Sequence, residues 1–216
     1  MRSLGVAILA ALLMSVSALA MGPPELRGHH QVGIHAGMWS QSTSTRTEVG
    51  IGGVETTVGS SGGMAGVSYG YWVHEGFAVR LDVGGMMTDI ETDVGIGGVQ
   101  TKTGSITRIL VGGKKSWTSS AFGPRFRPFV SAMIGPFIGN QNETHAGLSV
   151  VAESRTETAV GGVISIGSDI RIGSRFMVPV KVGYNLMTDF ENAIGGSRNY
   201  SGPEFSFGFG VVFGRM

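Results

Sequence analysis

The chain has 216 residues, of which 37 are glycine, none is cysteine and 14% are charged, with a formal net charge of +1. The near balance of charges gives no reason to expect nucleic acid as a partner. Without cysteine the chain forms no disulfide and has no thiol nucleophile. Glycine at more than twice its usual share of about 7%, with charge well below the usual share of about 25%, is unusual for a soluble domain.

The first twenty residues predict export. Arg2 gives a basic start, residues 4–18 form an almost unbroken apolar run, and Ala18 and Ala20 form a small-x-small pair. This is the pattern of a signal peptide, with cleavage after Ala20. An uncleaved helical anchor is the alternative, but the run is shorter than the roughly 20 apolar residues that span a bilayer. The expected parts are a signal peptide at 1–20, a lead-in at 21–29 and one domain at 30–213.

Beyond the lead-in, apolar and polar residues alternate with a period of two, which predicts β-strands. In the last such segment Phe205, Phe207 and Phe209 share one face with Val211 and Phe213, opposite small or polar residues. Most segments have about the 9–11 residues that a membrane-spanning strand needs. Eight strands are expected, at residues 30–41, 62–72, 77–88, 104–113, 127–138, 158–171, 175–187 and 203–213.

The connections between these segments differ in length in a regular way. Residues 73–76 and 172–174 are short and 114–126 are intermediate, whereas the other connections have fifteen or more residues. Membrane barrels have short periplasmic turns and long outer loops. The chain is therefore predicted to be all-β, an eight-stranded antiparallel up-and-down transmembrane barrel with both ends on the periplasmic side. The long connections are 42–61, 89–103, 139–157 and 188–202.

The charges within the strands favour a membrane barrel over a soluble, lipocalin-like one. They fall on the less apolar face, where a narrow lumen would let them pair, while each Arg or Lys facing lipid would cost about 2–4 kcal/mol at the midplane. The expected lumen network is Arg80, Asp82, Arg108, Asp169, Arg171, Lys181 and Glu204. Aromatic residues near strand ends are expected to form lipid-facing girdles. They are Trp39, Tyr69, Tyr71, Trp72, Trp117, Phe122 and Tyr184.

Residues 47–56 and 92–101 are an internal repeat. Each reads as a hairpin tip, with Val49 facing Val54 and Val94 facing Val99. The long outer connections are therefore expected to continue the barrel strands as ribbons. A hairpin duplication kept for folding is favoured over a shared binding motif. The glycines of the two tips are Gly50, Gly52 and Gly53, and Gly95, Gly97 and Gly98, and Ile194-Gly195-Gly196 echoes them.

The C-terminal stretch resembles the assembly signal of outer-membrane barrels. Ser206, Gly208, Val211 and Phe213 fill the positions of that signal, although the chain continues for three residues beyond Phe213. Together with Arg127-Pro128-Phe129, this stretch is similar to the small eight-stranded outer-membrane barrels, the opacity-like and OmpA- or OmpW-like proteins. The resemblance covers residues 30–213 and implies location in the outer membrane of a Gram-negative cell, with insertion by the barrel-assembly machinery.

Two features suggest local departures from a regular barrel. Pro136 and Pro179 lie inside expected strands, where a missing N–H donor predicts bulges or misplaced boundaries. Lys114, Lys115, Arg125 and Arg127 surround Trp117 in the intermediate turn. That basic cluster is interpreted either as a contact for lipid headgroups or as a solvated turn.

No catalytic, cofactor or metal site is expected. Barrels that resemble lipid A deacylases carry a His-x-Ser-Asn motif, which this chain lacks. His35 is the one histidine within a strand on the expected lumen face, and a hydrogen-bonded filler is the favoured interpretation. A metal site of His29, His30 and His35 is not favoured, because no cysteine or carboxylate within residues 30–41 completes it.

The favoured function is a structural or surface-interaction role, adhesion-like and without catalysis. The expected partners are outer-membrane lipid, the insertion machinery and an unidentified surface ligand. A narrow OmpW-like channel for small solutes is the first alternative. A lipid-modifying barrel enzyme and a soluble binder are less favoured.

Overall fold

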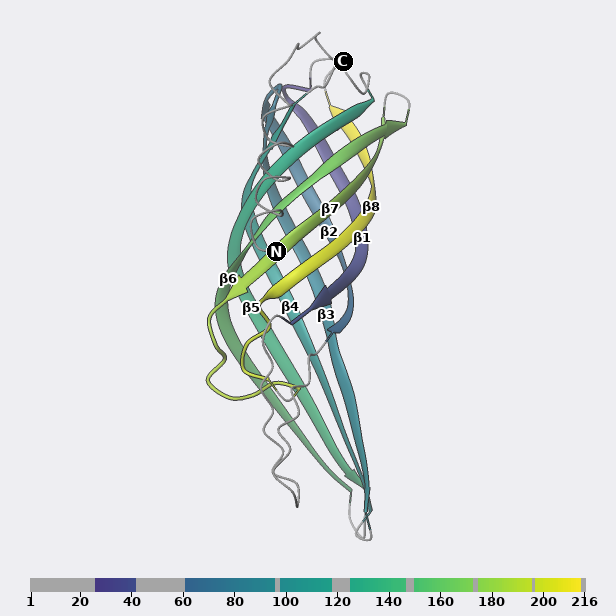
Figure 1. Ribbon diagram of the computed structural model, residues 1–216, viewed down its shortest axis with the longest axis vertical. Coiled ribbons are helices and arrows are strands. Elements are labelled where there is room, and N and C mark those ends of the chain that lie inside the picture. Colours follow the sequence, from purple (N-terminus) through teal and green to yellow (C-terminus); the bar gives the residue numbers. More distant parts are fainter. Residues whose placement is uncertain are drawn as a thin grey trace, which may run out of the picture.

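A computed structural model describes residues 26–41, 61–95, 98–117, 125–146, 150–172, 175–195 and 197–214. Eight antiparallel strands form a closed barrel in chain order, and β1 closes it by pairing with β8 (Figure 1). The strands are β1 (His29–Ser40), β2 (Ser61–His74), β3 (Phe77–Gly95), β4 (Gly98–Ser116), β5 (Phe126–Ala146), β6 (Val150–Ile172), β7 (Phe176–Met187) and β8 (Gly202–Gly214). No helix in these residues is both long enough and apolar enough to cross a membrane.

The eight expected strands are confirmed, but four of them are much longer than expected. Strands β3 to β6 have 19 to 23 residues, whereas β1 and β7 have 12 each. The last β2–β3 pair is Met64 with Met86 and the last β6–β7 pair is Gly161 with Met187, yet β4–β5 pairing continues to Val99 with Ala146. A four-stranded extension therefore leaves the barrel at the lower end of Figure 1. We call it the outer sheet and define it as residues 90–95, 98–103, 140–146 and 150–159.

The outer sheet confirms for two of the long connections, β3–β4 and β5–β6, that they continue the barrel strands as ribbons. Val94 pairs with Val99, and Gly95 pairs with Gly98 at the tip of β3–β4. The β5–β6 ribbon likewise pairs as far as Ala146 with Val150. Residues 42–60, which include the first copy of the repeat with Gly50, Gly52 and Gly53, lie outside the described residues, as does Gly97.

The outer surface of the barrel is apolar, as the alternation predicts. Large exposed side chains project from all eight strands, and Ile34, Ile134 and Phe207 are each more than half exposed. The expected lipid face of β8 is confirmed, since Phe205, Phe209 and Phe213 are also exposed. Such a surface is stable in lipid because the closed ladder satisfies the backbone hydrogen bonds internally.

The expectation of bulges at the two prolines was wrong. Pro136 pairs with Val160 and Pro179 pairs with Asp169 in unbroken register. Each proline removes one donor, so the loss falls on one neighbouring strand while the pairing to the other continues. The register shifts lie elsewhere, between Trp72 and His74 and between Met87 and Ile90.

Candidate functional site

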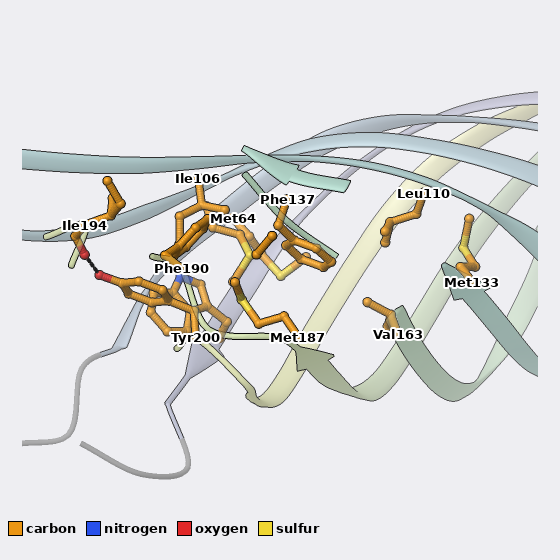
Figure 2. Close-up of a cluster of buried hydrophobic side chains, with 13 residues drawn as sticks. Met64, Ile106, Leu110, Met133, Phe137, Val163, Met187, Phe190, Ile194 and Tyr200 are labelled. Atoms are coloured by element: carbon orange, nitrogen blue, oxygen red, sulfur yellow. Dashed lines mark hydrogen bonds between the residues drawn. The ribbon is translucent and has the colours of Figure 1, made fainter. Parts of the chain in front are cut away.

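An apolar layer fills the outer end of the lumen. Phe190, Ile194 and Tyr200 descend from the β7–β8 connection onto side chains of the barrel wall (Figure 2). All three are fully buried. We call residues 188–195 and 197–201 the cap loop. The wall residues of this layer are Trp39, Met64, Met86, Ile106, Leu110, Met133, Phe137, Ala159, Val163 and Met187.

Hydrogen bonds hold the cap loop against the barrel. The Tyr200 hydroxyl donates to the carbonyl of Ile194 (Figure 2), and the Asn199 amide donates to the carbonyl of Met187 at 3.0 Å. The N–H of Gly195, a residue with φ of 56°, donates to Gln141 at 2.9 Å. The expectation that this connection would also form an outward ribbon was therefore wrong. The connection folds inward and buries its apolar residues. An outward hairpin would leave those residues in water.

A buried ionic network crosses the lumen beneath the apolar layer. Arg108 on β4 donates to Glu204 on β8 at 2.5 Å, and its Nε lies 3.7 Å from Asp82 on β3. Lys181 lies 3.7 Å from Glu204, and His35 lies 3.7 Å from Asp82. The ion pairs thereby join four strands, β3 and β4 on one wall and β7 and β8 on the other.

A second ion pair lies closer to the periplasmic turns. Lys114 pairs with Asp169, both fully buried, and its ammonium lies 4.1 Å from the centre of the Phe129 ring. Arg127 lies over the Trp72 ring at 5.3 Å and donates to the carbonyl of Glu75 at 3.1 Å. Such cation–π contacts partly compensate the cations for lost water.

This pair corrects the interpretation of the basic cluster. Lys114 and Arg127 belong to the lumen, while Lys115 and Arg125 are exposed. The expected turn began too early, because β4 continues to Ser116. Counting by twos from Arg108 along an extended strand would have placed Lys114 on the lumen face.

The seven charges expected in the lumen all lie there. Six of them are less than 9% exposed, and the Lys181 side chain is 10% exposed. Five are joined in the cross-lumen network or the Lys114–Asp169 pair, and they are Asp82, Arg108, Asp169, Lys181 and Glu204. Arg80 and Arg171 lie on the same inner face, at 7% and 8% exposure.

The aromatic residues divide between the two faces of the wall. Tyr69, Tyr71 and Tyr184 are 40% exposed on the outside, as expected of a girdle. Trp39 and Trp72 were assigned wrongly, since both are buried inside the barrel at 2% and 0% exposure. Position near a strand end does not set the face of the wall, because the alternation of side chains decides it. Phe122 lies outside the described residues, and Trp117 is half-buried.

The lumen offers little space for chemistry. A cavity of about 10 Å³ lies beside His35, with Arg80, Lys181 and Ser206 among its lining residues. That volume holds about one water molecule. His35 and Asp82 are 3.7 Å apart, beyond hydrogen-bonding distance. The described residues contain no cluster of three or more His, Cys, Asp or Glu side chains that could hold a metal ion.

The remaining sequence-derived sites are placed as follows. On β8, Ser206 lies on the lumen face and Phe213 on the lipid face, with Gly208 and Val211 between them in the same strand. Recognition of this stretch by the insertion machinery stays a prediction. The cleavage site at Ala18 and Ala20 lies outside the described residues.

An apolar exterior around a charged, closed lumen defines a transmembrane β-barrel. The family profile described as the outer membrane protein beta-barrel domain matches residues 6–213, so the chain belongs to that family. The protein is thus an integral protein of the cell outer membrane. No curated protein matches the chain by sequence.

Several solved barrels share this fold. The attachment invasion locus protein Ail of Yersinia pestis is 12% identical with a TM-score of 0.50, covering 87% of this chain and 99% of Ail. Neisserial surface protein A is 13% identical with a TM-score of 0.53, covering 86% and 97%. OprG from Pseudomonas aeruginosa is 12% identical with a TM-score of 0.50, covering 88% and 97%. At these identities the similarity concerns the fold.

Proposed function

We propose that the protein acts at the cell surface through its outer sheet, as an adhesion-like interaction module without catalysis. The carrying observation is that β3 to β6 continue past β1, β2, β7 and β8 while the lumen beneath is closed. An extended sheet above the membrane offers a surface that a barrel alone does not need for stability. The structure of Ail, named for attachment and invasion, shows that such a barrel fold occurs in a protein of that class.

The composition of the outer sheet suggests the charge of the partner. The register places Lys102 opposite both Glu91 and Glu143, and Glu143 opposite Glu153. Two basic residues, Lys102 and Arg155, therefore accompany five acidic ones. The acidic residues are Glu91, Asp93, Glu143, Glu153 and Glu157. This excess favours a basic or neutral partner over a polyanion, because complementary charge steers association.

The preference for a basic or neutral partner distinguishes this chain from Ail. Ail has been crystallised in complex with the heparin analogue sucrose octasulfate. Heparin is a polyanion, and the acidic outer sheet of this chain should repel it. We therefore propose that the surface ligand here is not a sulfated polysaccharide.

The test compares vesicles that carry the refolded protein on poly-lysine-coated and heparin-coated surfaces. Vesicles that carry the wild-type protein should bind more strongly than protein-free vesicles to the poly-lysine surface, and equally weakly to the heparin surface. Replacing residues 91–102 and 142–154 each by Asn-Gly, a turn suited to hairpins, removes four of the five acidic residues. This truncation should abolish the difference and leave the barrel folded. Changing the five acidic residues to amides should do the same. Vesicles carrying the exposed-site control E75Q/E191Q should bind like the wild type. Equal binding by the truncated protein would contradict the proposal.

A conducting channel is the alternative, and the described lumen argues against it. The cap loop seals the outer mouth, and the ionic network crosses the middle. Eight strands leave an interior that side chains alone can fill. We expect no channel openings in planar bilayers from the wild type, and none after removal of Phe190 and Ile194 by alanine, because the Arg108–Glu204 pair still blocks the path. Stable openings in the wild type would favour the channel.

The outer surface of the barrel suggests the partners of the protein during insertion and in the membrane. The apolar residues exposed around the barrel require lipid, and the β8 stretch from Ser206 to Phe213 is proposed as the contact for the insertion machinery.

A further inference from the structure

The described lumen holds more cations than carboxylates. Apart from Arg171, the basic side chains inside are Arg80, Arg108, Lys114, Arg127 and Lys181, and the acidic ones are Asp82, Asp169 and Glu204. A buried charge without a counter-charge costs several kcal/mol. The apolar layer separates these charges from the bulk water at the outer end of the barrel, so that water does not screen them. A further negative charge inside, beyond the three carboxylates, would offset that cost.

The middle of the lumen shows where such a charge would lie. The cross-lumen network with Arg80 contains three cations, Arg80, Arg108 and Lys181, against the two carboxylates Asp82 and Glu204. Arg108 contacts both carboxylates, at 3.7 and 2.5 Å. Both carboxylates of the network therefore contact Arg108, and its surplus positive charge is located near Arg80 and Lys181.

The cavity of about 10 Å³ lies between these two cations. Its remaining polar lining consists of Gln31, His35, Ser68 and Ser206, and neither Asp82 nor Glu204 lines it. Every one of these six polar side chains can donate a hydrogen bond. Ser206 Oγ and His35 Nε2 are buried without a hydrogen-bond partner among the described residues. A cavity lined by donors and two cations, with no carboxylate, is suited to an anion.

We propose that this cavity binds one small monatomic anion of the halide class, held between Arg80 and Lys181. The volume admits about one water-sized particle, which excludes phosphate, sulfate and organic acids. The bound anion balances the surplus charge of the network and offers an acceptor to Ser206. It stabilises the closed barrel as a structural ion, independently of any surface ligand.

Crystals of the protein grown in chloride and transferred to bromide provide the first test. An anomalous bromine peak is expected in the cavity of the wild type. The peak should be lost in R80Q and in K181Q and retained in K115Q, which removes an equal charge from an exposed site. A water molecule in place of the peak, or a peak that persists in both lumen variants, would overturn the proposal.

Unfolding in solution provides a second readout that does not require crystals. Urea midpoints of the vesicle-embedded barrel are compared in chloride and in gluconate at equal ionic strength. A ligand that binds the folded state alone raises its stability as the free ligand concentration rises. The midpoint of the wild type and of K115Q should be higher in chloride, whereas the midpoint of R80Q should be the same in both salts. Equal midpoints for the wild type would contradict the proposal.

Discussion

Arg108 and Glu204 meet in the middle of the lumen from strands on opposite sides of the barrel, with 2.5 Å between the Arg108 Nη1 and Glu204 Oε2 atoms. Both side chains are 1% exposed. In water such a pair would contribute little, but here each partner is the main compensation for the burial of the other. The pair also fixes the distance between two walls that the hydrogen-bond ladder joins only through the strands between them.

Removing both partners should therefore cost less than the two single removals added together. We expect E204M to lower the free energy of unfolding by about 3–5 kcal/mol, because Arg108 and Lys181 both lose a carboxylate. The double variant R108M/E204M should cost less than the sum of the single variants. Urea unfolding in vesicles, followed by the shift between boiled and unboiled bands on SDS gels, measures this. Additive losses would show that the pair is not coupled.

Barrel closure should depend on the lack of a side chain at Gly37. A Cβ there would overlap the carbonyl oxygen of Phe205 on β8, where β1 closes the barrel. We expect G37A to destabilise the barrel by about 1–3 kcal/mol through overpacking and to reduce the yield of the closed form. Gly63 on β2 is the matched control, since a Cβ there meets no atom within 4 Å. If G63A and G37A refold equally well, close approach at β1–β8 does not limit assembly.

Anchoring of the cap loop should be visible as resistance to trypsin. Arg198 is exposed, but its Nε donates to the Phe190 carbonyl at 2.9 Å, and the loop around it is bonded to the barrel. We expect slow cleavage after Arg198 in the wild type and markedly faster cleavage in Y200A, which loses both a buried ring and a hydrogen bond. E191Q, a change at an exposed position of the same loop, serves as the control. Equally fast cleavage in all three would contradict an anchored cap.

The inward position of Trp72 should be visible in its fluorescence. Lipids brominated on their acyl chains quench indoles that face the bilayer. A variant that keeps only Trp72, W39F/W117F, should be quenched weakly because Trp72 is fully buried in the lumen. Adding Y71W to a variant without the three native tryptophans places an indole one residue away on the lipid face, where strong quenching is expected. Strong quenching of Trp72 would mean that the faces of β2 are reversed.

The strands and their faces could be predicted from the sequence because they follow from local chemistry. Alternation along Phe205 to Phe213 fixes which side of β8 meets lipid, since successive side chains of a strand point to opposite faces. The same rule put Arg108, Lys181 and Glu204 inside the barrel. The Val94–Val99 register was also predictable, because the glycine-rich tip between them fixes the turn.

The tertiary structure decided which of these residues meet. Arg108 and Glu204 are 96 positions apart, and their contact depends on barrel closure, which no local pattern encodes. The sequence predicts a turn at residues 114–126, which includes Lys114, and only the pairing with β5 shows that β4 reaches Ser116. The cap loop looked like another polar connection, because Phe190, Ile194 and Tyr200 have no periodicity. Their burial became favourable only once the folded barrel presented an apolar mouth to receive them.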